Sequence, residues 1–285
     1  MEGAAAPDDV RFVTSRDGTR IGYRRSGRGP ALVLLHGAMQ SGINFRRLAE
    51  HLADRFTVIV PDRRGRGLSG PFRDGHGIRA EVDDLDAVIA DTGAADVFGL
   101  SSGALVVLEA ALGVPTIRRV ALYEPPLRIA GRQSSIQFAP RYEREMAAGD
   151  LAAAFVTVLK GTGDRTILTR LPRFLLVPLL RMEMRREHPR PDGAPLLRDL
   201  LPTVRFDVGL VEEVSGRLPD YAAISAETLL VGGSKSAPFL AAALDALAGV
   251  IPRNRRLELR GIGHIGPDNS GRPGRVAAEL RRWFG

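Results

Sequence analysis

Short apolar runs of four or five residues recur along this 285-residue chain, and each leads into a loop rich in glycine or polar residues. Helical patterns separate most of these runs. Alternation of this kind predicts buried strands that lie mostly parallel in one sheet, with helices on both faces. The runs comprise residues 31–35, 57–60, 97–100, 119–123, 228–231 and 256–259.

The first residues depart from this pattern. Residues 10–23 alternate apolar and polar side chains on both sides of an Asp17-Gly18 turn. This alternation predicts an antiparallel hairpin at one edge of the sheet, which then has eight strands. Helices are expected near residues 42–54, 78–91, 102–112, 236–249 and 273–284.

Between Pro126 and about Asp220 the strand pattern stops, and Leu, Met, Phe, Arg and Pro dominate. A connection this long does not belong in the core of an α/β fold, so residues 127–220 are predicted to form an inserted helical lid. Residues 1–126 and 221–285 then form the core. Most apolar side chains of the lid are expected to pack against the core, and the others to enclose an apolar pocket. Those expected to pack include Phe174, Leu175, Leu179, Met182 and Met184.

The composition argues against several classes of function. The formal net charge is +7, but the arginines are scattered among acidic residues, so nucleic-acid binding is not expected. No apolar run approaches the roughly 18 residues of a membrane span, and no secretory signal is recognised, which favours a cytoplasmic protein without a membrane partner. Cysteine is absent, which excludes disulfides and thiolate catalysis. A monomer or homodimer that acts on a small molecule is expected.

The strongest functional motif lies in residues 97–104. Ser101 stands in Gly99-x-Ser101-x-Gly103, between an apolar run and an Ala/Leu-rich helical pattern. A nucleophile elbow places its serine on a strained turn, and small residues two positions away on each side let strand and helix approach. Ser101 is therefore the candidate nucleophile.

Further motifs follow the other strands in a fixed order. Residues 31–35 lead into His36-Gly37, residues 57–60 lead into a loop that reads Asp-Arg-Arg-Gly-Arg-Gly-Leu-Ser, and the last strand leads into Gly-x-Gly-His264. Together with the elbow, this ordered set resembles the α/β-hydrolase superfamily over essentially the whole chain. The resemblance implies an α/β-hydrolase fold with its active site at the carboxyl ends of the strands.

A serine nucleophile needs an adjacent base, and histidine has an ordinary pKa near 6.5. Of the five histidines, only His264 follows the last strand in a Gly-x-Gly-His context, which makes it the candidate base. His36 is expected to brace its own loop by hydrogen bonds. His51, His76 and His188 are expected to lie at the surface.

The oxyanion hole is expected to consist of backbone N–H groups, one from the residue after the nucleophile and one from the loop after residues 31–35. By position these residues are Ser102 and Ala38, with Met39 as the alternative to Ala38. The side chain of Ser102 is expected to cap the following helix, because serine is among the best N-terminal caps.

The third member of the triad departs from the commonest family pattern. Most of the superfamily is similar in carrying Gly-x-x-Asp after the seventh strand, but here residues 232–236 read Gly-Gly-Ser-Lys-Ser. A minority, haloalkane dehalogenases among them, carries the acid after the sixth strand, where Glu124 stands. Glu124 is the candidate acid. Alternatively, Glu124 only ties down its loop, and Asp268 or Asp207 orients His264.

The arginine-rich loop at residues 62–69 resembles a structural element of the family, and no catalytic role is expected for its arginines. It lacks the Gly-Lys-Ser/Thr of a phosphate-binding loop, and the elbow lacks Gly-x-Gly-x-x-Gly, so no nucleotide cofactor is expected. No spacing of His, Asp and Glu suits a metal ion.

Serine at position 101 disfavours epoxide hydrolase and haloalkane dehalogenase chemistry, because those family mechanisms use a carboxylate nucleophile. The expected activity is hydrolysis of an ester, lactone or thioester of a small, fairly apolar molecule through an acyl-enzyme. Two alternatives remain open. One is a lyase, carbon–carbon hydrolase or cyclase that uses the same serine and histidine for proton transfer, and the other is a ligand-binding receptor on the hydrolase scaffold.

Overall fold

Eight strands form one sheet in the order β1-β2-β4-β3-β5-β6-β7-β8, in a computed structural model that describes residues 9–132, 135–162, 171–186, 188 and 193–285. Strand β2 runs antiparallel to both of its neighbours, and the other neighbouring pairs are parallel. This sheet is the predicted one. The strands are β1 (Asp9–Thr14), β2 (Arg20–Gly27), β3 (Ala31–Leu35), β4 (Thr57–Pro61), β5 (Asp96–Leu100), β6 (Arg119–Tyr123), β7 (Glu227–Gly233) and β8 (Asn254–Leu259).

The edge hairpin is formed by β1 and β2, with Val13 opposite Ile21. Its turn follows from local chemistry, because the Asp17 carboxylate accepts a hydrogen bond of 2.8 Å from the backbone N–H of Thr19. Gly18 adopts a φ of +82°, a region in which a side chain is unfavourable. The predicted hairpin is therefore confirmed.

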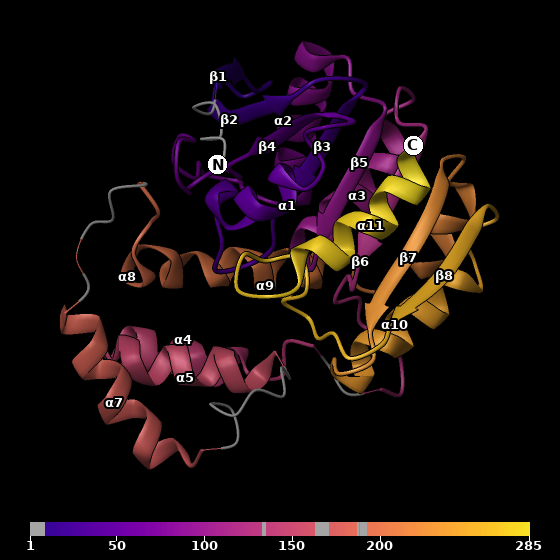
Figure 1. Cartoon of the computed structure of the whole chain (residues 1–285). Helices are drawn as coiled ribbons and strands as arrows, with labels where there is room; N and C mark the ends of the chain where they lie inside the picture. The colour runs from indigo at the N-terminus through magenta and orange to yellow at the C-terminus, as the bar shows by residue number, and fades with distance from the viewer. Residues whose placement is uncertain (1–8, 133–134, 163–170, 187, 189–192) are drawn as a thin grey trace.

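Helices cover both faces of the sheet (Figure 1). Because successive strand residues point to opposite faces, Leu32 and Leu34 join one core and Val33 and Leu35 the other. The described helices include none that is long and apolar enough to cross a membrane. The first face carries α1 (Arg46–Glu50), which follows the 3-10 helix η1 (Gly42–Phe45), and α11 (Pro273–Phe284); the second carries α2 (Ile78–Thr92), α3 (Ser102–Gly113) and α10 (Pro238–Ala248).

The residues between β6 and β7, called here the inserted segment, are mainly helical. In Figure 1, α4, α5 and α7 form a block beside the sheet, and α9 lies between this block and the sheet. The segment has a small core of its own around Tyr142 and Leu201. Its helices are α4 (Ala139–Ala147), α5 (Leu151–Gly161), α7 (Arg173–Arg186), α8 (Leu197–Leu200) and α9 (Val204–Glu213), with 3-10 helices η2 (Leu201–Thr203) and η3 (Leu218–Ala223).

Helix α7 corrects one expectation. Phe174 is 73% exposed, and Leu175, Leu179 and Met182 are exposed as well, so the prediction that these four side chains pack against the core is wrong. The helix contacts α5, and Leu176 is its buried residue. Hydrophobic periodicity identifies the apolar face of a helix, but it does not say that another element covers that face.

Candidate active site

Ser101 lies at the sharp turn between β5 and α3, with φ 55° and ψ −123°. A Cβ atom at Gly99 would lie 2.7 Å from the Cα atom of Ala104, and one at Gly103 would lie 2.7 Å from the carbonyl oxygen of Leu35. Both distances are too short for a side chain, so the two glycines allow the strand and the helix to meet at the serine. The elbow geometry thus follows from the sequence motif.

Glu124 follows β6, and its side chain is 1% exposed. One carboxylate oxygen, Oε2, lies 2.7 Å from Nδ1 of His264, in the loop after β8. The other, Oε1, accepts a hydrogen bond of 2.6 Å from the backbone N–H of Gly233. A carboxylate at Nδ1 keeps the proton on that nitrogen and leaves the lone pair on Nε2, as a general base requires. The same carboxylate also ties β6 to the end of β7.

The two alternative acids are bound elsewhere. Oδ2 of Asp268 accepts hydrogen bonds from the side-chain amides of Gln40, at 2.8 Å, and Asn44, at 2.9 Å. The carboxylate of Asp207 binds the guanidinium groups of two arginines in the loop after β4. The structure therefore brings Glu124, rather than either aspartate, to the Nδ1 atom of His264.

Backbone strain is concentrated at this site. Among the described residues other than glycine, positive φ angles occur at Met39 (58°), Ser101 (55°) and Glu124 (50°). Such angles cost of order 1 kcal/mol or more and persist where the surroundings enforce them, often at functional sites. In the loop of Met39, the N–H of Gly37 donates to Oε1 of Gln40 at 3.0 Å. Because the Gly37 N–H is already hydrogen-bonded, the candidate oxyanion donors of this loop are the N–H groups of Ala38 and Met39.

A cavity of about 150 Å³ brings the serine and the histidine together. The loop after β3 forms one side, and α5 of the inserted segment forms an apolar wall with Phe155, Val158 and Leu159. The lining consists of Gly37, Ala38, Met39, Gln40, Leu100, Ser101, Phe155, Val158, Leu159, Thr162, His264 and Ile265.

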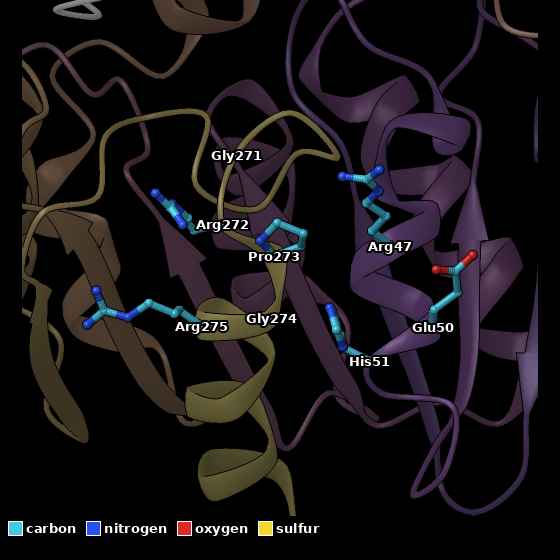
Figure 2. A pocket seen from close by; sticks show the side chains of 8 residues that line it. All are labelled: Arg47, Glu50, His51, Gly271, Arg272, Pro273, Gly274 and Arg275. Carbon is cyan, nitrogen blue, oxygen red and sulfur yellow. The ribbon is translucent and has the colours of Figure 1, made fainter. Parts of the chain in front are cut away.

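A larger, open hollow of about 540 Å³ lies between α1 and the start of α11 (Figure 2). It shares no lining residue with the cavity at Ser101. Two of its arginines already bind backbone carbonyl oxygens: Arg47 donates to Asn269 at 3.2 Å and Arg275 to Arg260 at 3.0 Å. Its size alone therefore does not make it the reaction site.

His36 is fully buried and braces its loop as expected. Nε2 accepts a hydrogen bond of 3.1 Å from the backbone N–H of Arg63, so the proton resides on Nδ1, which donates to the carbonyl oxygen of Gly37 at 2.9 Å. Burial and the nearby charges of Arg66 and Arg63 lower the pKa of His36 well below its ordinary value. The ring is therefore neutral.

Two other expectations are wrong. The side chain of His76 is 2% exposed, and its ring makes edge contacts with Phe72 and Phe206. The prediction of a surface position is wrong because Phe206 of α9, which is distant in sequence, packs against the ring. Ser102 does not cap α3. Its hydroxyl donates to Asp207 at 2.8 Å, because Ser102 is the first residue of α3 and faces a buried ion cluster.

This ion cluster is not predicted from the sequence. Arg63, Arg66, Glu81 and Asp207 are each at most 5% exposed, although the loop that carries the arginines was expected to be an ordinary structural turn. The available signal was the density of arginines in a loop next to buried strands. Their acidic partners lie far away in sequence, so pairing could not be read from spacing. In the described part of the chain, no cluster of His, Asp and Glu side chains could hold a metal ion.

The sequence pattern of the alpha/beta hydrolase family matches residues 32–279. The chain belongs to this family. An alpha/beta hydrolase from Sphaerobacter thermophilus is 30% identical, with a TM-score of 0.75, and the match covers 96% of this chain and 100% of that one.

Other solved structures share the fold of this alpha/beta hydrolase. An esterase from a Rhodococcus species is 22% identical, with a TM-score of 0.69, over 96% of this chain and 98% of that one. An enol-lactonase from Burkholderia xenovorans is 20% identical, with a TM-score of 0.71, over 96% and 99% of the two chains. Curated relatives match over short stretches. An uncharacterized protein of Mycobacterium tuberculosis is 41% identical over 64 residues, which span 22% of this chain and 18% of the relative.

Proposed function

We propose that this alpha/beta hydrolase is a serine hydrolase that cleaves an ester, lactone or thioester of a small, apolar molecule. The observation that carries the proposal is the arrangement around one cavity: Ser101 on its elbow, and His264 with a carboxylate at Nδ1. The similar folds of an esterase and an enol-lactonase agree with this reaction class.

In the proposed reaction, Oγ of Ser101 attacks the substrate carbonyl carbon while Nε2 of His264 takes the hydroxyl proton. Glu124 stabilises the imidazolium that forms. The N–H groups of Ser102 and Ala38, with Met39 as the alternative to Ala38, bind the oxyanion. His264 then gives its proton to the leaving oxygen or sulfur, and water hydrolyses the acyl-enzyme by the same steps.

The size of the cavity supports a narrower proposal for the substrate group. An engineered apolar cavity of about 150 Å³ in another protein binds benzene, which has six heavy atoms. The cavity beside Ser101 has a similar volume and a largely apolar wall from α5. We therefore infer that it takes an unbranched acyl chain of about six carbons or a single ring. The inserted segment then acts as the lid that closes the site from water.

Fluorophosphonate labelling tests the nucleophile directly. The probe is expected to modify Ser101 alone, with the adduct mapped by mass spectrometry, and Ser101→Ala is expected to lose both labelling and turnover of a chromogenic ester. Labelling without turnover of esters, lactones or thioesters would instead favour the lyase or carbon–carbon hydrolase chemistry. Full turnover by Ser101→Ala would refute the proposal.

A series of acyl esters from acetyl to decanoyl tests the cavity. Between acetyl and hexanoyl, kcat/KM is expected to rise up to about fourfold per methylene, since each buried methylene contributes about 0.8 kcal/mol. Longer chains are expected to lose this gain. Leu159→Ala, which enlarges the wall, should move the optimum to longer chains, whereas Leu179→Ala on exposed α7 should leave it unchanged. A flat series would contradict an apolar acyl cavity.

A further inference from the structure

Four buried charged side chains meet beside the elbow. Arg63 and Arg66 come from the loop after β4, Glu81 comes from α2, and Asp207 comes from α9 of the inserted segment. Their charges balance, two positive and two negative, as burial at this depth requires. Asp207 is the member of this cluster that the inserted segment supplies.

The carboxylate of Asp207 reaches the residue next to the nucleophile. Its Oδ1 accepts hydrogen bonds from the hydroxyl of Ser102, at 2.8 Å, and from Nη1 of Arg63, at 2.9 Å. Nη1 of Arg63 also donates to the hydroxyl of Ser102 at 3.0 Å. Oδ2 of Asp207 accepts from Nη2 of Arg66 at 2.7 Å. The Ser102 hydroxyl thus donates one hydrogen bond and accepts another. These bonds hold Ser102 in place, and the Ser102 N–H is one of the two oxyanion donors of the proposed reaction.

Arg63 also reaches the second proposed oxyanion donor, through His36. The backbone N–H of Arg63 donates to the His36 ring, which in turn donates to the carbonyl oxygen of Gly37. In a planar trans peptide, the carbonyl of Gly37 and the N–H of Ala38 point in opposite directions. Holding this carbonyl therefore fixes the direction of the Ala38 N–H. Both oxyanion donors are connected to one arginine.

The charge states fit these roles. Burial alone would raise the pKa of Asp207, but Arg66 and Arg63 outweigh it and hold the pKa below its ordinary value. Asp207 is therefore a carboxylate that accepts from all three of its partners. Burial opposes the charge of Arg63 as well, yet Glu81 and Asp207 raise the pKa of its guanidinium.

We propose that Asp207 is a positioning residue for the oxyanion hole: through Ser102 and Arg63 it makes the alignment of both N–H donors depend on α9 of the inserted segment. The inference rests on the proposed serine hydrolase function. It gives α9 a part in transition-state stabilisation as well as in covering the site. Asp207 touches no reacting atom, so its removal should affect kcat much more than KM.

A second buried pair in the same loop provides a matched control. Arg64 binds the carboxylate of Asp84 through two hydrogen bonds, of 2.6 and 2.7 Å, and both residues are at most 5% exposed. The guanidinium of Arg64 also donates to the carboxylate of Asp17 and to the carbonyl oxygen of Ala80, which lie outside the cluster at Ser102. Asp84→Asn therefore makes the same chemical change in a buried ion pair away from the oxyanion donors.

The test compares Asp207→Asn with Asp84→Asn. Removing an oxyanion donor costs about 10²–10³-fold in kcat, so misalignment of the two N–H donors is expected to lower kcat about 10–10²-fold. Asp207→Asn should show this loss with KM within about threefold, and its affinity for an alkyl boronate, which mimics the tetrahedral adduct, should fall in parallel. Asp84→Asn should lower the unfolding temperature to a similar extent but keep kcat within about threefold of wild type. Equal kcat losses in both variants would overturn the proposal.

If Asp207→Asn does not fold, Ser102→Ala provides a second test of the proposal, because this substitution removes one hydroxyl and leaves the ion pairs in place. It should lower kcat about 3–10-fold at unchanged KM. Unchanged kcat would overturn the proposal. Fluorophosphonate labelling of wild type separates this failure from failure of the proposed function. If wild type is labelled at Ser101 and Asp207→Asn reacts equally fast, the positioning role alone is wrong; if wild type is not labelled, the serine hydrolase function is wrong.

Discussion

The loops after β3 and β8 each present a histidine at the same end of the sheet, but they surround it differently. His36 is fully buried, and both ring nitrogens bind backbone groups. His264 has a 12% exposed side chain, borders the cavity and binds a carboxylate at Nδ1. A neutral carbonyl acceptor gives little help to an imidazolium, whereas a carboxylate stabilises it. The acceptor at Nδ1 thus distinguishes a neutral brace from a candidate base.

Replacing His264 should have the largest effect. His264→Gln is expected to reduce kcat on the order of 10⁴-fold or more, because Ser101 loses its base. The unfolding temperature should stay close to that of wild type, since the glutamine amide can still donate to the buried Glu124 carboxylate. Rates of chromogenic ester hydrolysis and a thermal melt check this prediction. A loss below tenfold would remove the distinction between the two histidines.

Glu124→Gln removes the negative charge that distinguishes the surroundings of His264 from those of His36, because a neutral amide replaces the carboxylate. The expected loss in kcat is on the order of 10²–10⁴-fold, since an amide can hold the ring in the wrong tautomer and does not stabilise its charge. The amide oxygen can still accept from the N–H of Gly233, so the protein should remain folded. Steady-state kinetics with a folded variant, checked by circular dichroism, measure this effect. An unchanged kcat would show that the carboxylate serves only to tie the two strands together.

His36→Gln should act mainly on stability and on its dependence on pH. The buried ring has a lowered pKa, whereas the unfolded chain has the ordinary value near 6.5. Below about pH 6.5 the unfolded chain binds a proton that the folded chain does not, so the free energy of unfolding falls with falling pH, by up to about 1.4 kcal/mol per unit. His36→Gln removes this pH-dependent part of the free energy of unfolding. It should also lower kcat about tenfold or less, because the Ala38 N–H is held less firmly.

Urea unfolding at pH 7 and pH 5.5 provides the measurement for His36. Wild type should lose more stability over this interval than His36→Gln. Equal losses in the two proteins would show that the ring accepts a proton in the folded state.

Ser234→Ala should have the smallest effect. The Ser234 hydroxyl accepts a hydrogen bond of 2.9 Å from the N–H of Gly261, at an exposed position in the loop that precedes His264. Loss of such a bond costs about 0.5–1.5 kcal/mol, so kcat should stay within about threefold. A loss comparable to that of Glu124→Gln would mean that the loop after β7 still orients the histidine. Paired kinetic assays of the two variants decide this.

The sheet was predictable from the periodic apolar patterns. A run such as residues 31–35 can bury the apolar side chains on both of its faces only by lying between two layers of helices. The elbow was predictable from Gly99 and Gly103, since their missing side chains are a direct requirement of the turn. The position of Glu124 next to His264 was predictable from the resemblance to family members that carry the acid after the sixth strand, because the loop after the seventh strand lacks one.

Partners distant in sequence were not predictable in the same way. Arg63 and Asp207 are separated by 144 residues and meet only after the inserted segment docks. The same limit explains the errors at Ser102 and His76, whose partners Asp207 and Phe206 come from α9. Local sequence preferences predicted a helix cap for Ser102 and a surface position for His76. Tertiary contacts with α9 determine the environment of both side chains instead.

The strained backbone at Met39, Ser101 and Glu124 limits how this chain can be stabilised. Glycine adopts positive φ angles without penalty, so replacement by glycine would relieve strain of about 1 kcal/mol or more at each position. It would also remove side-chain contacts, such as the hydrogen bonds of the buried Glu124 carboxylate, and it would loosen the unfolded chain. Substitutions that raise the stability of this chain without altering the geometry of the site are therefore expected to lie elsewhere.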